Sequence, residues 1–479
     1  MNPVALIFFL VCAISLLSVS RKWAPAALLV GCTYMTLGQG IEVASINLHV
    51  YRMMLLVGLL RVISRGEALV GGVNSIDKML IVWGGWAIIA SFFHEERYGL
   101  VYACGAVFNL TLVYFLTRIW CNDLDEVRDV VVVVAFLLIP LALEMLIEKV
   151  TGRNLFFVFG GVSEIVQSRE GKLRAQGPFL HAILAGTVGA TCIPLFVGIY
   201  SRYRTIATLG IAAGLIMTFA SASSGPVVSL LAGVGALMLW PYRQYLSKVR
   251  IAFVLIYVLL MLAMTRPPYY LISKIDLSGG STGWHRANLI EMTFQHFSEW
   301  WLIGTDRTRH WMPAQGIGAD PAHTDITNYY IGMGVFAGLP AMLLIIGMIV
   351  TAFRWVGHFV DAKLETQPEQ SFMIWCIGAC LFSHMLSGIS VAYFDQSVLF
   401  FWLSIAIISS AWSGNQLQMN ELTLDTLLSE KEKFSSEISP VSDVGLINVE
   451  WRRRFREQVA ETNPLELIIE DSSKNEFKR

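Results

Sequence analysis

Charged residues are scarce in this chain of 479 residues, where Asp, Glu, Lys and Arg together make up 15% of the positions. A soluble domain usually carries about a quarter. Hydrophobic residues make up 55%, and the mean hydropathy is +0.58. The net charge of −1 provides no overall field that would favour nucleic-acid binding. These deficits argue against a soluble protein and predict an all-α, polytopic membrane helix bundle.

Several common sites are also missing from the sequence. No Gly-rich phosphate loop follows a predicted strand, and the loops assigned below to the outer face contain no Asp-x-Asp for a metal. The seven cysteines lie almost wholly in apolar segments, which favours buried thiols over disulfides or a metal site. We therefore expect no cofactor and no bound metal. No basic residue precedes the first apolar run, which is predicted to be a retained helix and not a cleaved signal.

Apolar blocks of roughly 17–25 residues recur along the chain, long enough to cross about 30 Å of hydrocarbon. No repeat period stands out, which argues against a transporter built from duplicated halves. The sequence predicts 12–13 transmembrane helices. The segments are about 3–20, 24–38, 43–63, 77–93, 99–120, 129–148, 178–200, 205–221, 224–240, 251–265, 326–353, 372–392 and 396–413.

Basic residues occupy every second connection between these segments, which assigns those connections to the cytoplasm. They include Arg21, Arg61, Arg118, Arg202, Arg243 and Arg354. The prediction is a membrane domain over residues 1–414 and a polar cytoplasmic tail over 415–479. Two longer loops, 149–177 and 266–325, then lie on the outer face. Both contain several cations, which is unusual there; they are either ordinary exposed loops or parts of a shared site for an anion.

The first loop ends in Arg174-Ala175-Gln176-Gly177-Pro178-Phe179-Leu180-His181. Proline suits the first turn of a helix, so we expect a helix to begin at Pro178. Its free amide groups, with Arg174 beside them, would then hold a phosphate oxygen. The alternatives are that Arg174 is a membrane-surface anchor and that His181 is an ordinary interfacial residue.

The second loop contains a candidate interfacial helix that begins near Gly283-Trp284-His285-Arg286. Its apolar residues recur near helical spacing, and Trp300 and Trp301 suit headgroup depth. Arg286 can make a bidentate contact with a diphosphate. The tryptophans, including Trp284, would stack on sugar rings or simply anchor the helix.

The second loop ends in Ala322-His323-Thr324-Asp325, followed by a membrane helix with Asn328, Gly332, Gly334 and Gly338. An imidazole titrates near neutrality, so His323 can accept a hydroxyl proton, with Asp325 or Asn328 orienting it. The glycines suit close helix packing. The alternative is a structural loop histidine.

These three motifs together resemble the O-antigen ligase and O-antigen polymerase superfamily. The resemblance covers residues 170–350 and rests on Arg174-x-x-Gly177-x-Phe179-x-His181, on Arg286 followed by Gly304, and on His323 before a Gly-containing helix. Thr324 stands where the family usually has Asn, and the Gly-x-x-Gly is stretched to Gly334-x-x-x-Gly338.

The resemblance implies a GT-C-like, metal-independent glycosyltransferase at the outer face of a bacterial inner membrane. Its donor would be an undecaprenyl-diphosphate-linked glycan, its acceptor a glycan or lipid-linked glycan, and its surroundings membrane lipids. A chain-length regulator and a flippase are further implied partners. His323, Arg286 and Arg174 would be catalytic, and Arg266, Arg307, His181, Asn328 and Trp284 would bind substrate.

Two activities of this family remain open, and two other classes of protein compete with them. We favour polymerisation of exopolysaccharide or O-antigen repeat units over ligation to lipid A core, because the departures from the motif loosen the match to ligases. A transporter or flippase of a lipid-linked anion would place charges within the spans, where Arg52, Glu144 and His384 are the candidates. The remaining alternative is a structural subunit of an envelope assembly.

Overall fold

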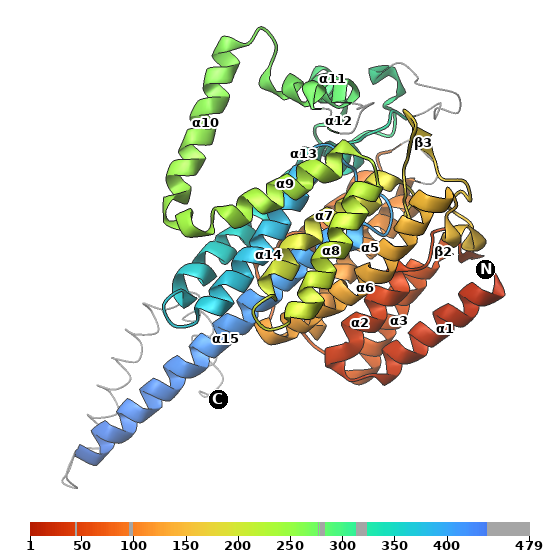
Figure 1. Cartoon of the computed structure of the whole chain (residues 1–479). Helices are drawn as coiled ribbons and strands as arrows, with labels where there is room; N and C mark the ends of the chain where they lie inside the picture. Colours follow the sequence, from red (N-terminus) through yellow and green to blue (C-terminus); the bar gives the residue numbers. More distant parts are fainter. Residues whose placement is uncertain (44–45, 95–98, 276, 278–282, 313–322, 438–479) are drawn as a thin grey trace. The chain divides into compact units, whose positions relative to one another are not determined.

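The computed structural model describes residues 1–43, 46–94, 99–275, 277, 283–312 and 323–437. The chain divides into two compact units, residues 1–414 and 415–479. Within the described residues the first unit is mostly helical, with two short antiparallel hairpins (Figure 1).

Thirteen of the described helices coincide with the thirteen predicted apolar segments. They are α1 (Pro3–Ser18), α2 (Ala24–Thr33), α3 (Val50–Arg65), α4 (Ser75–Ser91), α5 (Gly99–Trp120), α6 (Leu124–Thr151), α7 (Ala182–Gly198), α8 (Arg204–Ala220), α9 (Ser224–Met238), α10 (Leu246–Ala263), α13 (Tyr329–Lys363), α14 (Pro368–Ser387) and α15 (Val398–Glu437). In the described part of the chain, six helices are long and apolar enough to cross a membrane: α5, α6, α10 with the turn before it, α13, α14 and the first half of α15. The expectation of a helical membrane protein is therefore confirmed at this level.

Shorter elements fill the connections. They are the hairpins β1 (Gly40–Val43) with β2 (Ile46–His49) and β3 (Ser168–Arg169) with β4 (Lys172–Leu173), the helices α11 (Gly283–Gln295) and α12 (Phe297–Trp300), and the 3₁₀ turns η1 (Arg21–Trp23), η2 (Leu155–Phe159), η3 (Trp240–Tyr245), η4 (Pro268–Lys274) and η5 (Arg309–Trp311). Two predicted helix starts are wrong. The segment predicted to begin at residue 43 opens with the β1–β2 hairpin, so α3 begins at Val50. The helix expected at Pro178 begins at Ala182, after a turn.

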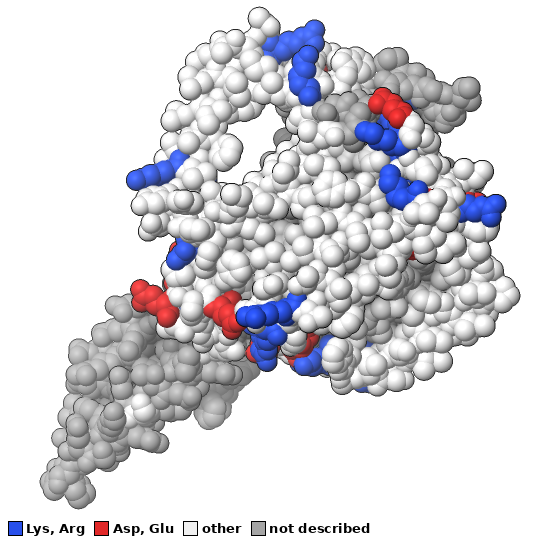
Figure 2. Space-filling view, viewed as in Figure 1, with Lys and Arg blue, Asp and Glu red and all other residues white. Residues whose placement is uncertain are grey.

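The basic connections gather at one end of the first unit. Arg21, between α1 and α2, pairs with Glu126 at the start of α6 at 2.8 Å. Arg202, between α7 and α8, lies 3.6 Å from Asp125. The α1–α2, α5–α6 and α7–α8 connections therefore reach the same end, in agreement with the alternation of basic residues. Figure 2 shows the charged side chains of one face in two groups, separated by a broad uncharged belt.

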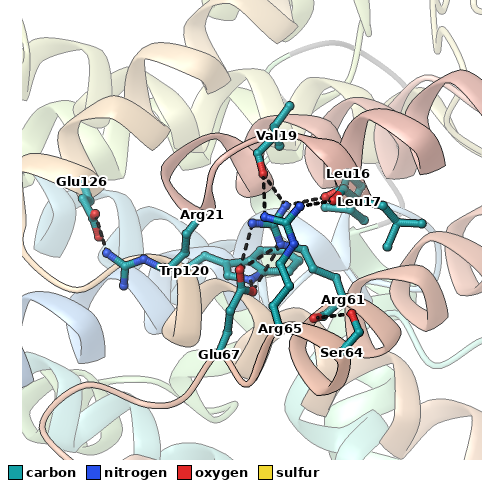
Figure 3. A network of polar contacts seen from close by, with 10 residues as sticks. All are labelled: Leu16, Leu17, Val19, Arg21, Arg61, Ser64, Arg65, Glu67, Trp120 and Glu126. Carbon is teal, nitrogen blue, oxygen red and sulfur yellow. Dashed lines mark hydrogen bonds and ion pairs between the residues drawn. The ribbon is translucent and has the colours of Figure 1, made fainter.

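The buried guanidinium of Arg61 connects several elements at this end through hydrogen bonds (Figure 3). Arg61 is fully buried and donates to the Glu67 carboxylate and to the carbonyl oxygens of Leu16 and Val19. Those carbonyls terminate α1 and have no partner within the helix. Trp120 donates its indole N–H to the same carboxylate at 2.6 Å. A charge buried at this depth needs an oppositely charged partner and several hydrogen bonds. Arg61 has both.

The opposite end carries the remaining connections, and it positions the candidate site. There α13 is broken at Ala337 and Gly338, whose backbone angles are non-helical. The segment after α12 satisfies the freed backbone groups: Thr305 N–H donates to Val335 O and Leu339 N–H to Trp301 O, both at 2.8 Å. A membrane-spanning helix tolerates a break only where such partners exist.

Candidate functional site

A cavity of about 900 Å³ lies at this end, within the size range of ligand sites. Most of its polar residues come from the connections, and its aromatic residues come from α4, α5, α13 and the α14–α15 connection. The polar residues include His94, His285, Asp306, Arg309, His323 and Asp325, and the aromatic ones are Trp83, Tyr102, Tyr329, Phe336, Tyr393 and Phe394. The wall therefore combines titratable groups with aromatic faces of the kind that pack on sugar rings.

His323 is held in this wall through its backbone. Arg309 Nη1 donates to the His323 carbonyl oxygen at 3.1 Å, and Thr324 N–H donates to Thr308 Oγ1 at 2.9 Å. His285 Nε2 lies 3.0 Å from the Asp325 carbonyl oxygen. The His323–Asp325 segment thus bridges α11 and the segment around η5, and this places His323, His285 and Asp325 around one space.

Arg174, Arg286 and Arg169 form a second feature, called here the arginine group. Arg174 Nη2 donates to Ser223 Oγ at 2.7 Å, and its buried Nε makes no hydrogen bond to a described residue. Arg286 Nε donates to the Ser390 carbonyl oxygen at 3.0 Å. Among the described residues, none of the three arginines forms an ion pair with a carboxylate.

The arginine group is close enough for its members to repel one another. Burial lowers the pKa of the Arg286 guanidinium, repulsion from Arg169 lowers it further, Asp325 acts in the opposite direction, and Arg174 again lowers it. Burial and then Arg169 lower the pKa of Arg174. Arginine keeps its proton despite such shifts. The group is therefore a half-buried positive site that an anion would stabilise.

The α14–α15 connection joins the arginine group to the cavity. Ser390 accepts the hydrogen bond from Arg286, and Tyr393 and Phe394 line the cavity a few residues later. Asp325 also belongs to both, since it lines the cavity and interacts electrostatically with Arg286. Arg174 and Arg286 therefore lie beside the cavity that His323 lines.

Carboxylates accept several amide groups of the 174–181 segment. Glu148, fully buried near the end of α6, accepts the N–H groups of Gln176 and Gly177, both at 2.7 Å. Asp395 accepts the Leu180 N–H at 2.9 Å. The predicted phosphate site used the amides that follow Pro178. Of these, Phe179 N–H donates to the Gln176 carbonyl oxygen and Leu180 N–H donates to Asp395, so these two are not available to a phosphate. Glu148 and Asp395 fix the turn that follows Arg174.

Replacing Glu148 by Gln should lower stability by about 3 kcal/mol, because one amide N–H then faces the NH₂ group of glutamine. Each carboxylate oxygen of Glu148 accepts from one of these backbone donors, so no rotation of a glutamine side chain satisfies both. The midpoint of thermal unfolding in detergent measures the loss. Glu164→Gln is the matched control, because its exposed carboxylate lies 3.8 Å from the exposed Arg153. Equal midpoints for the two variants would contradict this account.

Two of the predicted substrate-binding residues have structural contacts. Asn328 is buried and caps α13: its Oδ1 accepts Ile331 N–H at 3.0 Å, and its Nδ2 donates to the Ile389 carbonyl oxygen at 2.9 Å. His181 is the residue before α7, and its exposed ring packs edge-on against Phe394, with 5.4 Å between centroids. Asn328 thus holds the start of α13, whereas His181 lies beside a residue of the cavity wall.

The other three predicted substrate-binding residues are exposed, and the described cavity wall does not include them. Trp284 leaves 52% of its surface exposed. Arg266 lies over the Tyr270 ring, 5.1 Å from its centroid. In the sequence, Arg307 lies between Asp306 and Arg309, which both line the cavity. The structure brings together the predicted catalytic residues but not these three.

Several residues of the site had no assigned role in the sequence interpretation. Arg169 and Arg309 were counted only among the cations of the two longer loops, and Glu148 and Asp395 carried no expected role. A carboxylate near the end of an apolar helix is costly unless it has partners, and this was the available signal for Glu148. Nothing in the local sequence indicates which backbone groups it binds.

Comparison with known proteins supplies no relative. No family model, no curated protein and no solved structure matches the chain.

Proposed function

We propose that this protein is a membrane glycosyltransferase that uses an undecaprenyl-diphosphate-linked oligosaccharide as donor. The observation that carries the proposal is the arginine group: three neighbouring guanidinium groups without a carboxylate partner among the described residues, beside a cavity of about 900 Å³ that His323 lines. Such a group suits a ligand with more than one negative charge, and a diphosphate is such a ligand.

The chemistry assigned to the arginines is stabilisation of the leaving group. As the bond between the sugar and the diphosphate breaks, negative charge grows on the phosphate oxygen, and fixed cations in a partly dry site stabilise it. Arg286 is suited to this role because Ser390 holds its Nε while its terminal nitrogens make no hydrogen bond to described residues. Arg174, fixed by Ser223 and by the turn that Glu148 binds, contacts the same diphosphate.

His323 is proposed as the general base for the acceptor hydroxyl. It lines the cavity with Asp325 and His285, and the aromatic side chains of the same wall provide flat surfaces for the acceptor sugar. The new bond forms between the acceptor oxygen and the anomeric carbon, the hydroxyl proton passes to the imidazole, and undecaprenyl diphosphate leaves. This scheme uses only side chains of this protein.

We propose that the reaction is polymerisation of exopolysaccharide or O-antigen repeat units at the outer face of a bacterial inner membrane, with a GT-C-like bundle as scaffold. The sidedness rests on the basic connections gathered at the end opposite the cavity. Ligation to lipid A core is the sister activity that the same site could perform, because both reactions share the donor.

The test is a transfer assay with the purified full chain and lipid-linked repeat units. Growth of the glycan with this donor alone indicates a polymerase, and product formed only after addition of lipid A core indicates a ligase. His323→Ala should be inactive in either case while eluting as folded protein. No change in glycan length or linkage with either acceptor, relative to heat-inactivated protein, would contradict the proposal.

A further inference from the structure

Two histidines, His296 and His310, contact the carboxylate of Glu299 in α12. His296 Nδ1 lies 2.7 Å from Glu299 Oε1, and His310 Nε2 lies 2.9 Å from Glu299 Oε2. One candidate ligand atom from each of the three residues lies within 4.8 Å of the others. His296 and Glu299 are one helical turn apart, and His310 comes from η5. The cluster therefore joins two elements that are separate in sequence.

The chemistry of this cluster matches a transition-metal site. Two imidazoles and one carboxylate are a ligand set that zinc uses in proteins, at about 2.0–2.2 Å from the ion. Tetrahedral ligands at that distance stand about 3.3 Å apart, a value between the 2.7–3.1 Å of the histidine–carboxylate pairs and the 4.8 Å that bounds all three atoms. Trp311 donates its indole N–H to Glu299 Oε2 at 2.9 Å, and its ring stacks on His296 with centroids 5.6 Å apart. Outer hydrogen bonds of this kind orient metal ligands.

Three side chains contact the Glu299 carboxylate: the indole N–H of Trp311 and the facing ring nitrogens of His296 and His310. To bind a metal, each imidazole presents an unprotonated nitrogen and the carboxylate is ionised. The same distances also suit plain hydrogen bonds from two imidazole N–H groups, which is the competing interpretation.

We propose that His296, Glu299 and His310 bind a divalent ion of the zinc class. The ion joins η5 to α12 and thereby fixes the segment from Thr305 to Met312, part of which lines the cavity. His310 immediately precedes Trp311 and follows Arg309, whose guanidinium donates to the carbonyl oxygens of His323 and Met312. The site is structural and lies outside the reacting groups, so it is independent of the proposed transfer reaction.

The experiment measures binding of zinc alone to the full chain, with no glycan present. The protein is purified in detergent through a tag without histidine and treated with a chelator. It is then titrated with Zn²⁺ by calorimetry, and with Co²⁺ by visible absorption, which reports tetrahedral coordination. We expect one equivalent bound, with a Kd in the micromolar range or below, and a higher midpoint of thermal unfolding in zinc.

His310→Ala should weaken binding by at least about tenfold and remove the shift in the midpoint. This side chain is 52% exposed, so the variant should fold. His358→Ala is the matched control, because it removes a histidine of α13 outside the cluster and should bind zinc as the parent does. Binding of less than about a tenth of an equivalent by the parent, or equal binding by the parent and His310→Ala, would overturn the site in favour of hydrogen bonds alone.

Discussion

Arg286→Met should reduce glycosyl transfer by a factor of about 100 or more, the loss typical when one preorganised donor to a developing oxyanion is removed. The methionine keeps an unbranched apolar stem but has no charge and no hydrogen-bond donor. The measurement is the single-turnover rate with a saturating undecaprenyl-diphosphate-linked donor, which separates the chemical step from product release.

The same substitution should leave stability nearly unchanged. Arg286 loses one hydrogen bond to Ser390, worth about 1 kcal/mol. Against this loss, removing the charge relieves the repulsion from Arg169 and Arg174. Functional sites often hold groups that do not favour the folded state without ligand. The midpoint of thermal unfolding should therefore be close to that of the parent, and pyrophosphate should raise the midpoint of the parent only.

Arg153→Ala is the control for charge in the same region. Arg153 is exposed and lies 3.8 Å from Glu164, so its removal should change the transfer rate by less than about twofold. If Arg286→Met keeps more than half of the parental rate, the arginine group does not stabilise the leaving group. A large loss of stability in Arg286→Met would instead identify the arginine as a structural residue.

The helices were predictable because their signal is local. Each apolar segment is recognisable from its composition, and the thirteen predicted segments overlap with helices among the described residues, six of which are long and apolar enough to cross a membrane. The β1–β2 hairpin was missed because its apolar residues, Ile41, Val43, Ile46 and Leu48, run directly into the apolar start of α3. They alternate with period two, which is the signal of a strand, but the longer apolar run obscured it.

The site was predictable only in part, because its decisive contacts join distant residues. The motifs named Arg174, Arg286 and His323, and the structure places the first two beside the cavity that His323 lines. The motifs could not show that the Glu148 carboxylate accepts the N–H groups of Gln176 and Gly177, because 28 and 29 residues separate these partners in the sequence. The sequence likewise did not indicate that Asn328 is committed to capping α13.

The break in α13 leads to the largest expected loss of stability, in Gly338→Ala. Gly338 has φ +83° and ψ 174°, a conformation that essentially only glycine adopts. A Cβ atom there would lie 1.9 Å from the Leu302 carbonyl oxygen, which is backbone and cannot rotate away. The two effects together should cost more than about 4 kcal/mol, enough to prevent folding.

Gly357→Ala is the matched substitution in the same helix. Gly357 is exposed, and within the described residues no atom lies within 4 Å of an added Cβ, so alanine should be neutral or stabilise the helix by about 0.4–1 kcal/mol. The yield of monodisperse protein in detergent and its midpoint of thermal unfolding distinguish the two variants. A folded Gly338→Ala protein with the parental midpoint would mean that α13 continues straight through residue 338. The segment from Trp301 to Thr305 would then lose the backbone partners that hold the cavity wall in place.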